Sequence, residues 1–147
     1  MVLLDNARAR FEYEISETLV AGVVLSGGEV KSLRGKHGSL TGSFVKVIDN
    51  EVWMINAQIS PYPFANNTDY EPKRSRKLLL KRHEILKLQT DSLQKGRIMV
   101  PLRIEAVGHF IKVIIGIGRG KSTVDKRATV RKREQSRELD RFVKSQR

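Results

Sequence analysis

The C-terminal segment of this chain has too few apolar side chains to build a core, and this confines the foldable part to the residues before it. From Arg119 to Arg147 there are eleven Lys and Arg against four Asp and Glu, a net +7 of the chain's +12. So polar a segment cannot bury enough surface to offset the entropy lost on ordering. We therefore expect one compact domain over residues 1–118 and a basic tail over residues 119–147 that is disordered when free.

The composition removes several classes of chemistry. The chain has no Cys, which excludes disulfides, thiolate metal sites and Cys nucleophiles. Its three histidines, His37, His83 and His109, are scattered with no metal-ligand spacing. No set of nucleophile, base and orienting group is evident, so we expect no metal, no cofactor and no enzymatic activity.

The charge indicates the kind of partner. A net charge of +12 and a pI near 10.3 attract polyanions, and RNA is the partner that we expect. The apolar runs are too short to cross a membrane, and the N-terminus has no signal pattern. We expect a cytoplasmic protein with no membrane partner.

The residues before the tail are patterned mainly as strands. Two apolar runs, 43–48 and 52–59, flank Asp49-Asn50-Glu51 and predict a hairpin. Further strands are predicted over 13–25, 97–107 and 109–118, with helices over 29–34 and 73–93. This pattern favours a mainly β fold, an OB-like small barrel with flanking helices, whose usual ligands are nucleic acids and oligosaccharides.

Aromatic residues divide into two groups. We expect Phe44, Trp53 and Phe110 in the core, because they lie in apolar strand patterns. Residues 60–72 contain three prolines and a polar run, which predict a long exposed loop. Its aromatic side chains are better candidates for contact with a ligand: Tyr62, Phe64 and Tyr70.

The glycine-rich stretch from Gly116 to Thr123 invites comparison with a phosphate-binding loop. The Walker pattern needs four residues between its first Gly and the Gly-Lys pair, whereas Gly116 and Gly120 enclose three. We reject nucleotide binding and interpret this stretch as a flexible joint before the tail.

Two basic clusters lie before the tail. Residues 73–82 carry six Lys and Arg, which suit either phosphate contacts or a solvated helix face. The second cluster, Glu29, Lys31 and Arg34, includes a carboxylate, and mixed signs favour the recognition of a shaped RNA. An ion pair within the helix is the simpler explanation of this cluster when it is considered alone.

Six segments, taken in order, resemble the motifs of one family, the SsrA-binding proteins, also called SmpB. EVKSLR, RKLLL and DKR are specific in combination, and the resemblance covers nearly the whole chain. The segments are NARARFEYEI, LVAGVVLSGGEVKSLR, VWMINAQISPY, PKRSRKLLL, KGRIMVPLRI and GIGRGKSTVDKR.

The resemblance implies a role in trans-translation, the rescue of stalled bacterial ribosomes. Members of the family bind the tRNA-like domain of transfer-messenger RNA (tmRNA) through an OB-like barrel. Elongation factor Tu with GTP delivers the complex to the vacant A site. There the tail becomes helical in the empty mRNA channel, beside the decoding centre and its ribosomal RNA.

The family's functional residues carry over onto two sets of positions. The resemblance assigns RNA binding to Asn6, Arg8, Glu29, Lys31, Arg34, Arg74, Arg76, Lys77 and Lys121. It assigns ribosome binding to the tail residues Asp125, Lys126, Arg127, Leu139, Phe142 and Val143. Val124 stands where many members carry His or Tyr before DKR.

A second function fits the same residues. A general RNA-binding OB protein of the translation apparatus, with a tail that adds only non-specific affinity, would also be basic and rich in strands. It would bind any structured RNA of equal length with similar affinity.

Overall fold

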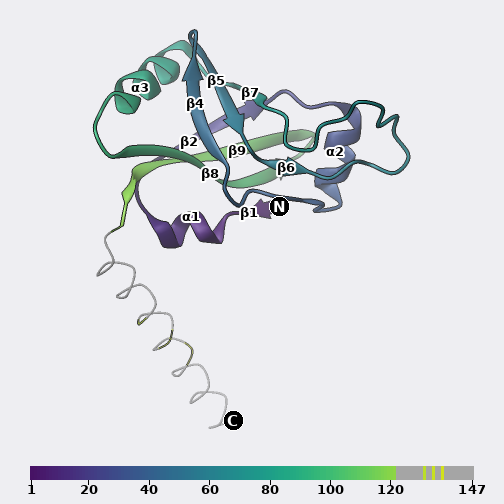
Figure 1. Ribbon diagram of the computed structural model, residues 1–147, viewed down its shortest axis with the longest axis horizontal. Coiled ribbons are helices and arrows are strands. Elements are labelled where there is room, and N and C mark those ends of the chain that lie inside the picture. The colour runs from purple at the N-terminus through teal and green to yellow at the C-terminus, as the bar shows by residue number, and fades with distance from the viewer. Residues whose placement is uncertain (122–130, 132–133, 135–136, 138–147) are drawn as a thin grey trace.

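The computed structural model describes residues 1–121 together with Arg131, Glu134 and Arg137. Short helices flank a mainly antiparallel β structure, which confirms the predicted fold class at that level (Figure 1). The helices are α1 (Ala7–Glu12), α2 (Gly27–Arg34) and α3 (Arg82–Ser92). The strands are β1 (Val2–Asp5), β2 (Tyr13–Val23), β3 (Gly38–Ser39), β4 (Phe44–Ile48), β5 (Glu51–Ile55), β6 (Gln58–Ile59), β7 (Arg76–Leu79), β8 (Arg97–Val107) and β9 (Phe110–Gly120).

The larger sheet has seven strands in the order β1-β8-β9-β2-β7-β5-β4, and β3 pairs with β6 in a separate ladder. It coils strongly, so β4 and β5 cross over β8 and β9, and β4 contacts β8 (Figure 1). In the described part of the chain no ladder joins the edge strands β1 and β4. Barrel closure, a finer feature of our prediction, is not detected.

The core lies inside this coiled sheet. Its members include Met54, Ile104 and Ile115 from three different strands, all fully buried. Leu33 of α2 and Leu88 of α3 add the apolar faces of two helices. These helices therefore cover separate parts of one core.

The predicted hairpin is confirmed by the pairing of β4 with β5. Val47 faces Val52, and the turn residues Asp49 and Asn50 have φ of 49° and 63°. Asp and Asn tolerate this left-handed region better than most residues, so they fix a tight two-residue turn. Gly108, with φ of 60°, similarly connects β8 to β9 where the sequence predicted a joint between strands.

The single helix predicted over residues 73–93 is wrong in its first part. Residues Arg76–Leu79 form β7, which pairs with β2 on one side and β5 on the other. Arg76 and Leu78 are buried while Leu79 is exposed, so the side chains alternate as in a strand. The helix begins at Arg82, nine residues after the predicted start at residue 73.

The flexible glycine joint is also wrong, because Gly116, Gly118 and Gly120 lie within β9. This strand pairs with β2 and with β8 along the same stretch. A Cβ on Gly118 would overlap the backbone carbonyl of Glu14, and one on Gly116 would lie 2.9 Å from Leu102. Close packing between strands, rather than freedom to swing, is what requires glycine at these two positions.

Candidate RNA-binding surface

Glu29 is placed by the first turn of α2. Ser26 caps the helix, since its Oγ accepts a hydrogen bond from the Glu29 amide at 3.2 Å. The Glu29 carboxylate in turn accepts one from the Ser26 amide at 2.9 Å. This reciprocal capping box aims the carboxylate toward the interior beside the helix N-terminus.

Two arginines from β7 and the loop before it meet that carboxylate. Arg76 Nε donates to Glu29 Oε2 at 2.7 Å, and both side chains are fully buried. Arg74 donates to Oε1 from a position that leaves it about one-third exposed. The simple intrahelix ion pair does not describe this carboxylate, because its partners Arg74 and Arg76 lie 45 and 47 residues away in the sequence.

Arg76 also holds the loop that precedes it. Its guanidinium donates to the carbonyls of Ala57 at 2.7 Å, Arg74 at 3.0 Å and Pro72 at 2.9 Å. Tyr70 completes the cluster, with its hydroxyl 3.2 Å from Glu29 Oε2 and donating to the Ile59 carbonyl at 2.8 Å. A buried charge needs such complete hydrogen bonding to be tolerated.

The cluster shifts the titration of its members. Burial opposes ionisation of Glu29, but the hydrogen bonds from Arg74 and the Ser26 amide, with the charge of Arg76, prevail and lower its pKa. Burial, together with the Glu29 charge, raises the pKa of Tyr70. Glu29 therefore stays an anion that neutralises the buried Arg76 from inside.

Further cations lie on the same elements as this buried cluster. Lys31 and Arg34 are exposed on α2, and Lys73 lies on the adjacent loop. Lys77 on β7 is partly exposed and lies 3.3 Å from the Glu51 carboxylate. We name Lys31, Arg34, Lys73 and Arg74 the α2 basic surface; their side chains are exposed or, for Arg74, partly exposed.

Asn6 and Arg8 lie at the other helix, α1. Asn6 is buried and caps α1, since its Oδ1 accepts from the Ala9 amide at 3.2 Å. Its Nδ2 donates to the carbonyls of Leu40 and Pro101 at 3.3 and 2.8 Å. All of these interactions are internal, so Asn6 joins the start of α1 to two other parts of the fold.

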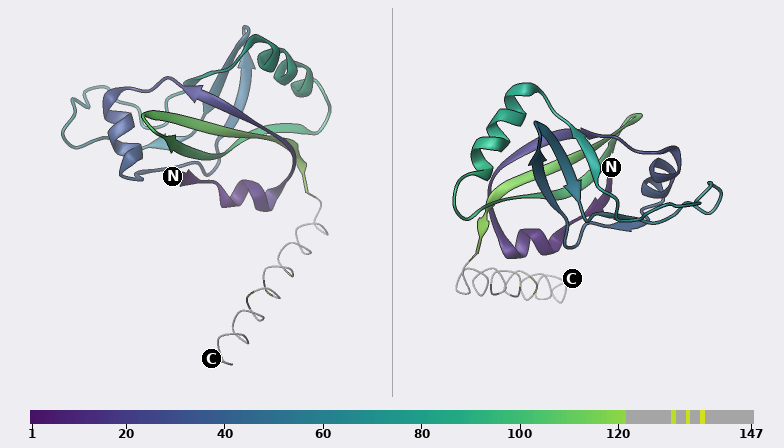
Figure 2. Two further views of the ribbon diagram at one scale, coloured as in Figure 1. Left: turned by 180° about the vertical axis from the view of Figure 1, so that it is seen from behind. Right: turned by 45° about the horizontal axis from the view of Figure 1, so that its top comes forward.

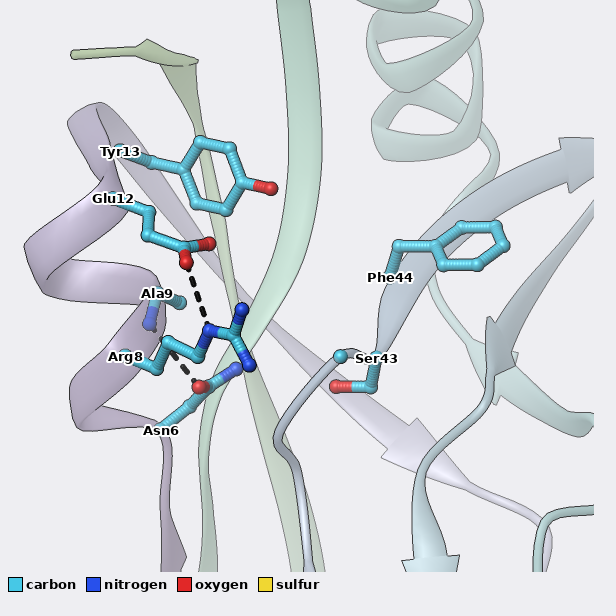
Figure 3. A pocket seen from close by; sticks show the side chains of 8 residues that line it. Asn6, Arg8, Ala9, Glu12, Tyr13, Ser43 and Phe44 are labelled. Carbon is cyan, nitrogen blue, oxygen red and sulfur yellow. Dashed lines mark hydrogen bonds and ion pairs between the residues drawn. The ribbon is translucent and has the colours of Figure 1, made fainter.

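A hollow of about 280 Å³ opens beside α1, between that helix and the start of β4 (Figure 3). The Arg8 guanidinium and the Tyr13 hydroxyl point into it, and Phe44 stands on its opposite side. Arg8 Nε lies 2.8 Å from Glu12 Oε1 and remains exposed. Lys121 comes close to the same helix, donating from Nζ to the Arg10 carbonyl at 3.1 Å.

The predicted RNA-binding residues thus fall into two groups. Asn6, Arg8 and Lys121 gather at α1, whereas the other six gather around α2 and β7. A role in RNA binding stays a prediction for all nine. The six predicted ribosome-binding residues of the tail, Asp125, Lys126, Arg127, Leu139, Phe142 and Val143, lie outside the described residues.

Two aromatic residues expected in the core are instead exposed. Phe110 at the β8–β9 turn is 67 % exposed, with Lys112 Nζ 5.5 Å from its ring centroid. Phe44 is 41 % exposed at the edge strand β4. A groove of about 400 Å³ between Leu79 and Phe110 adds a surface that sequence reasoning missed. Gly108 marks a turn directly before Phe110, but an apolar residue beside a turn suits burial as well as exposure, so the local sequence carried no decisive signal.

The described residues were also searched for a metal site and for a membrane-spanning helix. In these ranges no three acidic or histidine side chains gather so as to hold a metal ion. None of the helices there is long and apolar enough to span a membrane.

Three kinds of comparison bear on the identity of the chain. The family model described as "SmpB protein" matches residues 3–145. The "SsrA-binding protein" of Maricaulis maris is 48% identical over 141 residues, covering 95% of this chain and 90% of that protein. The "SsrA-binding protein" of Lactiplantibacillus plantarum is 43% identical over 142 residues, covering 97% and 91%.

A solved structure agrees with these relatives. Its chain, described as "tmRNA-SmpB: a journey to the center of the bacterial ribosome", has 43% sequence identity and a TM-score of 0.70. The match covers 84% of this chain and 87% of the solved one. The sequence resemblance is thus supported by an independent match in three dimensions, and the chain belongs to the SmpB protein family.

Proposed function

We propose that this chain binds the tRNA-like domain of tmRNA and delivers it to stalled ribosomes in trans-translation. The family match over residues 3–145 supports this function, as do relatives named SsrA-binding proteins. The observation that carries the proposal is the α2 basic surface, whose cations lie on α2 and on the loop before β7, the two elements that the buried pair of Glu29 and Arg76 joins. An RNA-binding protein of this family is not an enzyme, in agreement with the expected absence of catalytic activity.

The residues of the site divide into two roles in this proposal. Exposed Lys31 and Arg34, with the partly exposed Arg74, contact RNA phosphates or base edges directly. Buried Glu29, Arg76 and Asn6 act as positioning residues, since their polar atoms are already used inside the protein. Arg8, Lys77 and Lys121 lie at the periphery and add phosphate contacts.

The tail has a separate role in the proposal. Its net +7 suits a channel lined by ribosomal RNA, with Asp125, Lys126 and Arg127 near the decoding centre. Leu139, Phe142 and Val143 have the i, i+3, i+4 spacing of one helical face and would anchor a helix in the empty mRNA channel. When mRNA already fills the channel, the contacts that would order the tail there are removed.

The remaining parts of the proposal concern fold and setting. The contact between β4 and β8 supports an OB-like barrel, in which the coiled sheet nearly closes on itself. Delivery by elongation factor Tu with GTP, in the cytoplasm and without a membrane partner, follows from the family's role in translation. These assignments rest on family membership rather than on contacts within this chain.

The test is competition binding of the full-length protein to the tRNA-like domain, with an ordinary tRNA of similar length as competitor. At fixed salt we expect clear preference for the tRNA-like domain. Six neutralised phosphates would lower affinity for either RNA by about three decades between roughly 50 and 200 mM salt, so salt dependence alone does not discriminate. Equal affinity for both RNAs would contradict the proposal and leave a general RNA-binding protein.

A further inference from the structure

The loop over residues 60–75, here called the aromatic loop, projects from the body of the protein beyond α2 (Figures 1 and 2). Its two ends are held together where the Ile59 amide donates to the Pro72 carbonyl at 3.0 Å. Arg76 and Tyr70 fix the same end through the buried cluster. The loop is therefore anchored firmly at its base.

The aromatic loop is also braced against α2, both at its first residue and further along. Ser32 Oγ donates to the Ser60 carbonyl at 2.6 Å. Gly28 lets the loop approach closely, since a Cβ there would lie 3.2 Å from Ala65 Cβ and 3.7 Å from Tyr62 Cβ. Within the loop, Asn67 Nδ2 donates to the Tyr62 carbonyl at 2.8 Å. A long loop with this many contacts presents its side chains in a defined arrangement.

What the loop presents is an aromatic pair beside a cation. The rings of Tyr62 and Phe64 have centroids 5.5 Å apart at an interplanar angle of 68°, an edge-to-face pair. Lys31 Nζ lies 5.5 Å from the Tyr62 ring centroid. Phe64 is 88 % exposed, the highest value among the large apolar side chains described as exposed. Its contact with Tyr62 holds the Phe64 ring while most of its surface faces solvent.

We propose that Phe64 is a stacking platform for an unpaired base of the structured RNA, with Lys31 contacting the adjacent phosphate. This inference rests on the proposed function and names the part of the RNA that this surface takes. Sequence-specific proteins read RNA at single-stranded loops and bulges, whose splayed bases stack on aromatic rings. An exposed Phe64 ring in contact with Tyr62, whose ring lies beside Lys31, offers both halves of such a contact.

Charge and area favour a base over a protein as the occupant. The α2 basic surface, formed by Lys31, Arg34, Lys73 and Arg74, lies on α2 and the same loop. The exposed apolar area of the aromatic loop comes chiefly from Phe64. This area is far smaller than the area that a stable protein interface buries. One base needs only one ring face, so the small apolar area is sufficient.

The test compares full-length variants for affinity to the tRNA-like domain of tmRNA at fixed salt. Phe64→Ala and Phe64→Leu should each weaken binding by about tenfold, whereas Phe64→Trp should retain it. The dependence on salt should be unchanged in all three, because no charge is altered. Wild-type affinity in Phe64→Ala or Phe64→Leu would overturn the stacking role.

A matched control removes an equally exposed apolar side chain elsewhere. Leu93, at the end of α3, is 87 % exposed, and Leu93→Ala should bind RNA like the wild type. A loss equal to that of Phe64→Ala would overturn the proposal, since it would reflect a general effect of removing exposed apolar surface.

Fluorescence gives a direct readout of stacking. Trp53 is the sole tryptophan, so Phe64→Trp in a Trp53→Phe background places one fluorophore at the tip. Its emission should be quenched when the tRNA-like domain binds, and unchanged emission would overturn the proposal. If Phe64→Ala weakened only the complex with elongation factor Tu, the platform would contact protein instead, which also overturns it.

These outcomes distinguish failure of the Phe64 stacking site from failure of the proposed tmRNA-binding function. Wild-type preference for the tRNA-like domain combined with undiminished binding by Phe64→Ala would refute the stacking site alone. Loss of preference in the wild-type protein itself would refute the proposed function.

Discussion

Arg76 and Glu29 meet 2.7 Å apart in the interior, although 47 residues separate them in the sequence. One belongs to β7 and the other to the first turn of α2, so their contact fastens a helix to the sheet. The same arginine donates to three loop carbonyls. Removing either partner would therefore strand a buried charge and release two neighbouring elements.

We predict that Glu29→Ala lowers the free energy of unfolding by about 3–5 kcal/mol, because Arg76 would remain buried without its counter-ion. Urea denaturation measures this change. Glu51→Ala is the control, since Glu51 pairs with Lys77 at the surface and its loss should cost no more than about 1 kcal/mol. Equal losses in the two variants would contradict the structural role of the buried pair.

The lowered pKa of Glu29 predicts acid sensitivity. Unfolding returns the carboxyl to its ordinary pKa of about 4.3, so the unfolded chain takes up a proton at higher pH than the folded one. The contribution of Glu29 to stability is present above that pH and declines as pH falls through the lower folded pKa.

Unfolding free energies measured from pH 7 to pH 3 should therefore fall less steeply in Glu29→Gln than in the wild type. A smaller dependence of the unfolding free energy on pH should remain in Glu29→Gln. Asp5 still contributes to it, because the hydrogen bond from Arg10 lowers the pKa of Asp5. Identical slopes in the two proteins would show that Glu29 does not titrate as described.

The α2 basic surface predicts a specific change in RNA binding. Lys31→Ala with Arg34→Ala should weaken binding to the tRNA-like domain and reduce the slope of log affinity against log salt by about one for each phosphate that is no longer neutralised. The double variant Lys81→Ala with Arg82→Ala removes the same number of exposed charges at the start of α3. A salt series that changed equally in both variants would indicate only a general effect of net charge.

Gly118 predicts a defect in strand pairing. Gly118→Ala would place a methyl group on the Glu14 carbonyl, forcing β2 and β9 apart at a cost of about 3 kcal/mol or more. A Cβ on Gly120 would meet nothing within 4 Å, so Gly120→Ala should be far less harmful. The two melting temperatures test this, and the prediction fails if they fall by the same amount.

Local signals in the sequence were sufficient for some elements. Asp49 and Asn50 sit between two apolar runs, and their tolerance of positive φ specifies the turn without reference to the rest of the chain. Gly108 provides the same kind of local signal between β8 and β9. These two hairpins could be predicted because the determining residues are adjacent.

Other elements depend on partners distant in the sequence. Arg76-Lys77-Leu78-Leu79 lies directly before a true helix, and pairing with β2 and β5 is what makes it a strand. The pattern of residues 73–93 alone therefore extended the helix too far.

The same limit applied to the candidate site. Glu29, Arg74 and Arg76 were predicted from the sequence as functional residues. Their pairing with one another could not be predicted, because it depends on tertiary structure. The sequence did not decide whether Phe110 is exposed or buried, because an apolar residue in a strand beside a turn is compatible with either.

The end of β9 gives the remaining segment a fixed starting point. The strand is paired on both sides to its last residues, and the Lys121 amide donates to the Glu12 carbonyl at 2.9 Å. Lys121 is therefore held at a set position on the body of the protein. The number of residues between Lys121 and Asp125 consequently sets how far Asp125 can lie from the body of the protein. Adding or deleting one residue there would shift every later side chain relative to the surface that the body of the protein binds.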